Sequence, residues 1–166
     1  MSNSLRSLPL KVVAGLCLAT ASLAASAQTP PAYGASINIE QAKKAMVGAE
    51  AEARKNNWQV VISIVDTGGH LVMLQRLDAQ IASVDIATGK ARTATNFRRP
   101  TKALEDSLAA GGTAVRILAV PGVMPLQGGL PIVVDGKIIG GIGVSGVQAS
   151  QDEVVAKAGL DALAAK

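Results

Sequence analysis

The chain has 166 residues, enough for one domain with a substantial core, and its formal net charge is +4. Aromatic residues make up only 2% of it, so we expect an aliphatic core and no stacking platform for bases or sugars. Two of the sixteen basic residues lie in the first 27 positions. The modest positive charge of the rest of the chain does not indicate that the protein binds nucleic acid.

The first 27 residues have the pattern of a secretory signal peptide. Arg6 and Lys11 supply a basic start, an apolar run covers residues 12–23, and Ala25-Ser26-Ala27 is an A-x-A cleavage site. The apolar run is too short to serve as a membrane anchor. We therefore expect cleavage after Ala27 and a periplasmic or secreted protein, with no membrane span in its mature form.

The remainder divides into a short leader and one domain. Residues 28–37 include Pro30 and Pro31 and predict a flexible leader, whereas residues 38–166 predict a single folded domain. The only cysteine, Cys17, lies inside the signal peptide. The exported domain therefore has no disulfide and must be stabilised by packing alone.

The domain is predicted to begin with a helix and a hairpin. Asn38 and Gln41 fit a capping box, and the apolar spacing behind them indicates an amphipathic helix that ends near Asn56-Asn57. Two predicted strands follow, joined by a glycine-containing turn over residues 66–69: Trp58–Val65 and His70–Leu77.

Two more helices and a second hairpin are predicted next. Apolar residues at helical spacing indicate helices over Ile81–Phe97 and Thr101–Ala110, and Val115–Val120 predicts a short strand. Asp135-Gly136-Lys137 then separates the apolar runs Leu130–Val134 and Ile138–Val144, which is the strongest hairpin signal in the chain.

A capping box at Ser150 and Glu153 predicts a terminal helix. Strands paired in hairpins, with helices gathered separately, predict an α+β domain built on an antiparallel sheet of about five strands. Six glycines surround the second hairpin and suggest bulges, close backbone approach or a ligand against the main chain: Gly128, Gly129, Gly140, Gly141, Gly143 and Gly146.

The stretch Gly141-Ile-Gly143-Val-Ser-Gly146 matches the dinucleotide-binding pattern in letters only. Twenty residues follow it, too few for the helix, second parallel strand and ribose-binding acid that such a site needs. The sequence therefore does not predict a nucleotide-binding protein.

His70 is the only histidine and follows two glycines in the first hairpin. One histidine without a cysteine in the mature chain excludes a classical zinc site, and no C-x-x-C-H motif exists for covalent haem. Two alternatives remain open: an exposed turn residue, or a single ligand to the iron of non-covalent haem. Arg92 and Arg99 are seven residues apart, and this helical face is either solvated or suited to carboxylates such as propionates.

Several motifs together resemble one family. In order they are Val65-Asp66-x-Gly68-Gly69-His70-Leu71-Val72, Arg76-Leu77-Asp78, Ile86-Ala87, Lys90-Ala91-x-Thr93-Ala94, Gly128-Gly129-x-Pro131-Ile132, Ile139-Gly140-x-Ile142-Gly143-Val144-Ser145-Gly146 and Gln151-Asp152. Over residues 38–165 the chain is similar to the GlcG/HbpS family of haem-degrading or haem-binding domains. It is also similar to the C-terminal domain of PduO-type proteins.

The resemblance implies a profilin-like α+β domain that forms homo-oligomers and binds haem non-covalently. It implies His70 as the iron ligand, Arg76 or Lys90 beside the propionates, Thr93 in the same site, and the backbone at Gly128-Gly129 as a wall. Some members are secreted partners of sensor kinases, so we expect an exported haem- or tetrapyrrole-binding protein in haem or iron handling or sensing.

Two alternatives belong to other functional classes. One is an accessory enzyme or binder for a small organic acid, held by Arg76, Lys90 and the amides of Gly128-Gly129. The other is a structural oligomer that modulates a partner protein. Whether the protein is an enzyme stays open from the sequence.

Overall fold

The computed structural model describes residues 29–165, and the predicted signal peptide over residues 1–27 lies outside them. The described chain forms an α+β domain, as predicted. Its elements are β1 (Ala32–Tyr33), α1 (Ile39–Lys55), β2 (Val61–Asp66), β3 (Leu71–Arg76), α2 (Ser83–Phe97), α3 (Thr101–Ala109), the 3₁₀ helix η1 (Gly112–Ala119), β4 (Gly129–Val134), β5 (Lys137–Ser145) and α4 (Ala149–Ala164).

The sheet has five strands, and β5 is its central strand. Gly143 of β5 pairs with Ser63 of β2 on one side and with Gly129 of β4 on the other, both antiparallel. β3 continues the sheet beyond β2 and forms the predicted first hairpin with it. β1 pairs in parallel with the start of β5, which is the one departure from an antiparallel sheet among the described strands.

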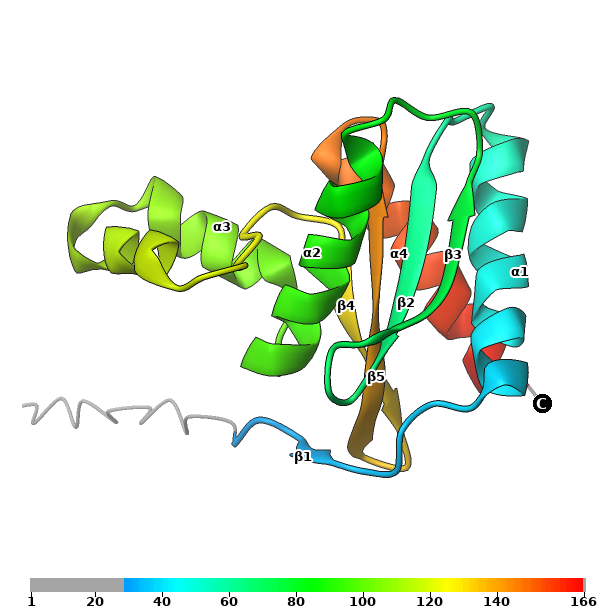
Figure 1. Ribbon diagram of the computed structural model, residues 1–166, viewed down its shortest axis with the longest axis horizontal. Coiled ribbons are helices and arrows are strands. Elements are labelled where there is room, and N and C mark those ends of the chain that lie inside the picture. Colours follow the sequence, from blue (N-terminus) through cyan, green and yellow to red (C-terminus); the bar gives the residue numbers. More distant parts are fainter. Residues whose placement is uncertain (1–28, 166) are drawn as a thin grey trace, which may run out of the picture.

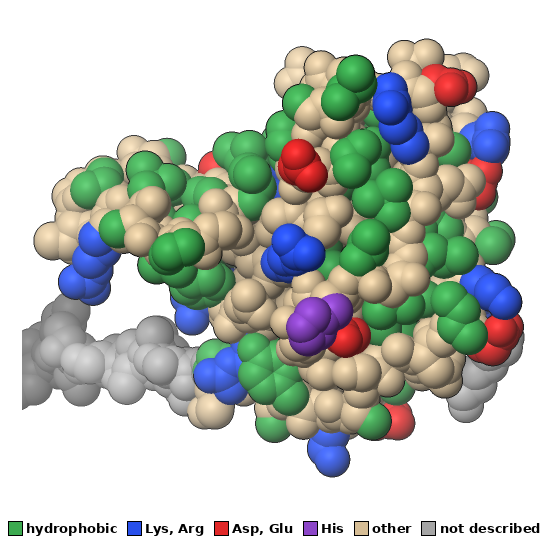
Figure 2. Space-filling model, in the orientation of Figure 1, with side chains coloured by type: hydrophobic (Ala, Val, Ile, Leu, Met, Phe, Trp, Pro, Cys, Tyr) green, Lys and Arg blue, Asp and Glu red, His purple; other side chains and the backbone are tan. Residues whose placement is uncertain are grey.

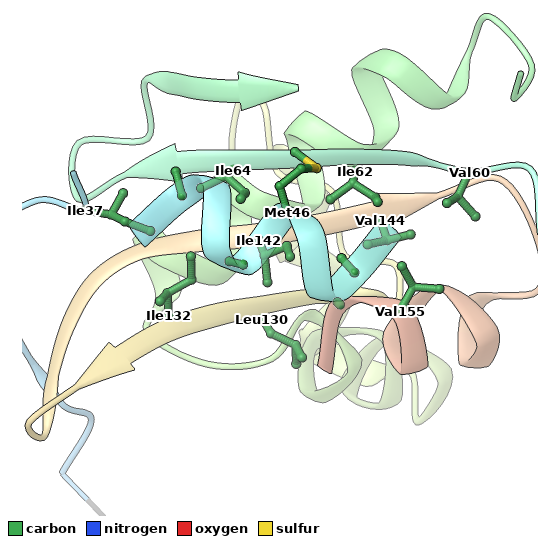
Figure 3. Close-up of a cluster of buried hydrophobic side chains, with 14 of the residues drawn as sticks. Ile37, Met46, Val60, Ile62, Ile64, Leu130, Ile132, Ile142, Val144 and Val155 are labelled. Carbon is green, nitrogen blue, oxygen red and sulfur yellow. The ribbon is translucent and has the colours of Figure 1, made fainter. Parts of the chain in front are cut away.

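Helices cover both faces of this sheet (Figure 1). α1 and α4 pack together on one face, where β2 and β5 direct their largest aliphatic side chains. Figure 3 shows Met46 from α1 among Ile62, Ile64 and Ile142 from the two strands. This buried cluster is almost entirely aliphatic, as the composition predicts, and α2 covers the opposite face.

The glycines of β5 allow α2 to lie against the sheet. A Cβ atom at Gly143 would lie 2.1 Å from the carbonyl oxygen of Ala87, and one at Gly141 would lie 2.2 Å from Thr95 Oγ1. Neither position has room for a side chain, so both must be glycine where α2 crosses β5. The close backbone approach that the glycines predict is therefore made at these two positions by helix α2.

Helix starts follow their capping residues. Asn38 and Gln41 form the predicted capping box at α1, where the Gln41 amide donates to Asn38 Oδ1 at 2.9 Å. At α4 the box is formed instead by Gln148 and Gln151, so the helix begins at Ala149 and the predicted pair Ser150 and Glu153 does not cap it.

The strand predicted over Val115–Val120 is wrong. Most of that segment belongs to η1, which has no buried residue and projects with α3 away from the sheet (Figure 1). Gly111 and Gly112 both have positive φ, +75° and +64°, and turn the chain into this arm. A short β-branched run forms a strand only where another strand is available to pair with it, and none of the described strands adjoins this segment.

Part of the predicted leader is ordered on the domain. Ala32–Tyr33 forms β1, and the Gly34 amide donates to the Ile138 carbonyl at 2.8 Å. The Tyr33 hydroxyl also donates to the Thr95 carbonyl at 2.9 Å. Residues 28–37 therefore include a short strand, and the division into a leader and a domain stays a prediction. Among the helices described, none is both long enough and apolar enough to cross a membrane.

Candidate functional site

A cleft of about 470 Å³ opens beside the first hairpin. It lies between β3, the exposed face of α2 and the loop that follows η1. Its walls are formed by Leu71, Leu74, Val84, Asp85, Thr88, Gly89, Arg92, Gly122, Val123 and Met124. The α2 residues recur at the spacing of one helical face, which explains how a single helix can form one wall.

Most of the wall is apolar. Five aliphatic or thioether side chains line it, and Asp85, Thr88 and Arg92 are the polar groups of α2 at its surface. Ligand sites in proteins commonly have this composition, an apolar surface with a few polar groups that orient the ligand. The cleft therefore suits an amphipathic ligand that carries an anionic group.

Two contacts with α2 hold the loop that carries Met124. The Met124 amide donates to Thr93 Oγ1 at 2.8 Å, and Thr93 is buried. A Cβ atom at Gly89 would lie 3.0 Å from the Cβ of Met124, so the loop packs directly on the bare helix backbone. Thr93 thus supports the loop behind the cleft through this hydrogen bond, and a contact between Thr93 and a ligand stays a prediction.

Arg92 connects the cleft to the turn before β3. Its Nε donates to the Gly69 carbonyl at 2.9 Å, and Gly69 has a φ of +80° that favours glycine. The guanidinium is therefore oriented at the cleft surface, where a planar carboxylate is its natural partner.

The same turn fixes His70. Asp66 Oδ1 accepts from the amides of Gly68 at 2.8 Å and His70 at 2.9 Å, and Asp66 Oδ2 lies 3.3 Å from His70 Nδ1. These bonds, the His70 amide first, hold the pKa of Asp66 below its ordinary value despite partial burial. An Nδ1–H that donates to this carboxylate leaves Nε2 as the nitrogen with a free lone pair, the arrangement found in many histidine metal ligands.

His70 stands at the rim of the cleft rather than in its wall. Its side chain is 83% exposed, and it is the purple side chain in Figure 2. Its neighbour Leu71 lines the cleft, and its other neighbour Gly69 bonds to Arg92.

The predicted site residue Lys90 is buried inside the domain. Its Nζ donates to Asp152 Oδ2 at 2.8 Å and to the Val144 carbonyl at 2.9 Å, and its side chain is 3% exposed. Burial raises the pKa of Asp152, although the Lys90 ammonium opposes that shift. The Lys90 ammonium is thus occupied in linking α2, β5 and α4.

The predicted glycine wall at Gly128-Gly129 packs against the same group. Gly128 has a φ of +118°, and a Cβ there would lie 2.8 Å from the Cβ of Asp152. The Gly129 amide donates to Thr101 Oγ1 at 2.9 Å. These two glycines contact the buried ion pair and α3, and they form no part of the cleft wall.

Arg76 lies at the opposite end of β3 from His70. A six-residue strand spans roughly 20 Å, so one small ligand cannot contact both side chains through short bonds. Arg76 Nε instead donates to the Ala79 carbonyl at 2.7 Å. The structure therefore separates the predicted site residues into three places: His70 at the cleft, Arg76 at the far end of β3, and Lys90 with Gly128 and Gly129 in the interior.

The residues that sequence reasoning missed are mainly Leu71, Val84, Thr88 and Met124. Asp85, Thr88 and Arg92 share a helical spacing that was readable in the sequence, but nothing local indicated that residues 122–124 return to cover that face. Within residues 29–165 no three acidic, histidine or cysteine side chains gather into a metal site. An iron ligand at this cleft would come from His70 Nε2 or the Met124 thioether.

The residues of the cleft fit haem in kind. An apolar macrocycle edge matches the aliphatic wall, and a propionate matches Arg92.

The chain is similar in sequence and in fold to several known proteins. Protein GlcG of Escherichia coli K12 is 47% identical over 111 residues, which are 66% of this chain and 81% of that protein. The crystal structure of Klebsiella pneumoniae protein ORFY matches with a TM-score of 0.76 at 28% identity, covering 85% of this chain and 99% of that one. A crystal structure of a PduOC–haem complex matches with a TM-score of 0.71 at 28% identity, covering 76% of this chain and 94% of that one.

The model of the family described as haem-degrading protein HbpS-like matches residues 37–161, most of the described chain. Together with the GlcG match, this confirms the resemblance seen in the motifs. The chain belongs to the GlcG/HbpS family.

Proposed function

We propose that this protein is an exported haem- or tetrapyrrole-binding protein of haem or iron handling or sensing, and that the cleft beside His70 is its binding site. The observation that carries the proposal is an apolar cleft bordered by one oriented guanidinium and one histidine. The haem complex of the PduOC relative supports the choice of ligand. The signal-peptide pattern of residues 1–27 supports export.

Each side of the cleft has a distinct task in this proposal. Leu71, Leu74 and Val84 bury the edge of the macrocycle, and burial of apolar area supplies most of the affinity. Arg92 replaces Arg76 and Lys90 as the partner of a propionate, because only Arg92 borders the cleft. His70 offers Nε2 to the iron. Bound haem would supply the redox and oxygen chemistry of its iron, and the protein would position it and limit water access.

Titration with haemin, followed in the Soret band, tests the ligand assignment. Wild-type protein should give a saturable, stoichiometric shift, and His70→Ala should bind with an altered Soret position because the iron loses its protein ligand. Asp66→Asn serves as the matched variant, since it keeps the imidazole and changes only the group that orients it. An unchanged spectrum in His70→Ala would remove His70 as ligand and leave haem binding intact. A titration that shows only free haemin in the wild type would reject the proposed function.

Assembly into a homo-oligomer, with a sensor protein as a further partner, is part of the same proposal. Its support is the arm of α3 and η1, which exposes Val115 at 53% and Leu118 at 61%. Apolar side chains gathered on a projecting element commonly mark protein interfaces. Light scattering during gel filtration should give a multiple of the monomer mass, and Leu118→Glu should lower it. A monomeric wild type at micromolar concentration would contradict this part.

A further inference from the structure

A second cavity, of about 670 Å³, lies where α2 ends and α3 begins. Arg98, Arg99 and Pro100, which join the two helices, line it together with Pro30 and Pro31 of the N-terminal segment. It shares no lining residue with the cleft described above.

The charge of this cavity is of one sign. Its described lining holds two guanidinium groups and no carboxylate. Over residues 29–165, neither Arg98 nor Arg99 takes part in an ion pair. On the exposed helix faces, by contrast, several basic side chains pair with an acidic residue three or four positions away, as Lys157 does with Asp161. Two adjacent arginines facing one hollow without a counter-charge create a local positive potential.

Both arginines are held in place by their neighbours. The Arg98 guanidinium carbon lies 5.9 Å from the centroid of the Tyr33 ring, and the Tyr33 hydroxyl is itself anchored to the Thr95 carbonyl at 2.9 Å. Arg99 Nε donates to the Phe97 carbonyl at 3.2 Å. Their remaining N–H groups can therefore meet a ligand with less ordering of the side chains.

The backbone at Arg98 adds a separate reason to expect a role for this side chain. Arg98 ends α2 with a φ of +54°, in the left-handed region where glycine is the favoured residue. An arginine there carries a conformational cost that glycine would avoid, and such strained positions are enriched at functional sites.

We propose that this second cavity binds a small oxyanion, a carboxylate or a phosphate group, through Arg98 and Arg99. Carboxylate and phosphate oxygens both match the planar fork of a guanidinium, and a cavity of about 670 Å³ leaves space for a compact organic anion. The site is independent of haem binding, because the two cavities have separate linings. It also gives a small organic acid a location other than Arg76, Lys90 and the glycine amides.

Calorimetric titration of the purified protein with malonate and, separately, with inorganic phosphate tests the proposal at constant ionic strength set by chloride. Arg99→Gln removes one charge, and Arg98→Gly removes the other while relieving the left-handed strain, so this variant should stay folded. Arg116→Gln is the control, because Arg116 is also exposed and lines a different cavity.

Wild type and Arg116→Gln should bind one of the two anions saturably, and each variant at Arg98 or Arg99 should bind it roughly tenfold more weakly. The titration that gives saturable heat, with malonate or with phosphate, identifies the class of anion that binds. Absence of saturable binding to both anions would overturn the proposal, and so would an equal loss in Arg116→Gln. Haemin titrations of the same variants should match the wild type, which separates failure here from failure of the proposed function.

Discussion

The Lys90 ammonium lies 2.8 Å from the Asp152 carboxylate in the interior of the protein, where each side chain is only 3% exposed. This pair joins α2 to α4 and also reaches the Val144 carbonyl of β5. Both Lys90 and Asp152 belong to the motifs that carry the family resemblance, and the structure indicates that their first task is to hold three elements together.

Lys90→Met should therefore destabilise the fold by about 3–5 kcal/mol at pH 7, because it leaves a buried carboxylate without its partner. Urea denaturation measures this change. The double variant Lys90→Met with Asp152→Asn should recover a large part of the loss, because the buried charge is then absent. Lys157→Met is the control, since its pair with Asp161 is about two-thirds exposed and should be worth less than about 1 kcal/mol.

The pH dependence of Lys90→Met should have a defined sign. Burial raises the folded-state pKa of Asp152 above its unfolded value, and removal of Lys90 strengthens that effect. A raised carboxyl pKa favours the folded state at low pH and costs stability as pH rises through it. The deficit of the variant relative to wild type should therefore shrink as pH falls from 7 toward the ordinary carboxyl pKa of about 4. A deficit that stays constant or grows would contradict the role assigned to Asp152.

Asp66 should give the opposite pH dependence. Its folded-state pKa is lowered by bonds from the His70 and Gly68 amides, so its contribution is present above its ordinary pKa and lost as pH falls through the folded value. Asp66→Asn should cost about 1 kcal/mol at neutral pH, because the amide oxygen can keep the two backbone hydrogen bonds, whereas the charge and the oxygen beside His70 Nδ1 are lost.

Urea denaturation curves from pH 7 to about pH 3 would show the wild-type advantage disappearing below about pH 4. Asp161→Asn, in an exposed pair, should leave the acid limb of the stability curve unchanged. A constant gap between wild type and Asp66→Asn down to the lowest pH would be inconsistent with an ionised Asp66 in the turn.

Gly89→Ala tests the cleft without touching a charge. The added methyl would lie 3.0 Å from Met124 Cβ, so the loop must shift by a few tenths of an ångström. The protein should stay folded, because alanine favours the helix by about 0.5–1 kcal/mol over glycine. Haem affinity should fall as the loop position changes. Normal affinity together with an unchanged melting temperature would show that the Met124 side of the cleft does not contact the ligand.

Local patterns predicted the fold well. These patterns are the capping box at Asn38, the Asp-Gly turn at residues 135–136 and the apolar runs of the two hairpins. Each acts over a few residues, so the sequence alone specifies it. Val115–Val120 failed for the opposite reason. Its β-branched character is real, but a strand needs a neighbour, and only tertiary structure determines whether one is present.

The site was less predictable, because its contacts join distant segments. His70 and Asp66 are four residues apart, and the turn between them was readable. Lys90 and Asp152 are 62 residues apart, and a lysine near a glycine motif looks the same in sequence whether it is buried or free to bind an anion. Met124 is held at the cleft by a hydrogen bond from its amide to the hydroxyl of Thr93, 31 positions away. Such pairings depend on how the helices dock on the sheet.

The most direct test of the cleft is a haemin titration of Arg92→Glu beside wild type. Reversal of this charge should repel a propionate and weaken binding by roughly tenfold or more. Arg116→Glu makes the same change of charge on the arm and should bind like the wild type. If Arg92→Glu binds haem as tightly as Arg116→Glu does, haem does not bind in this cleft.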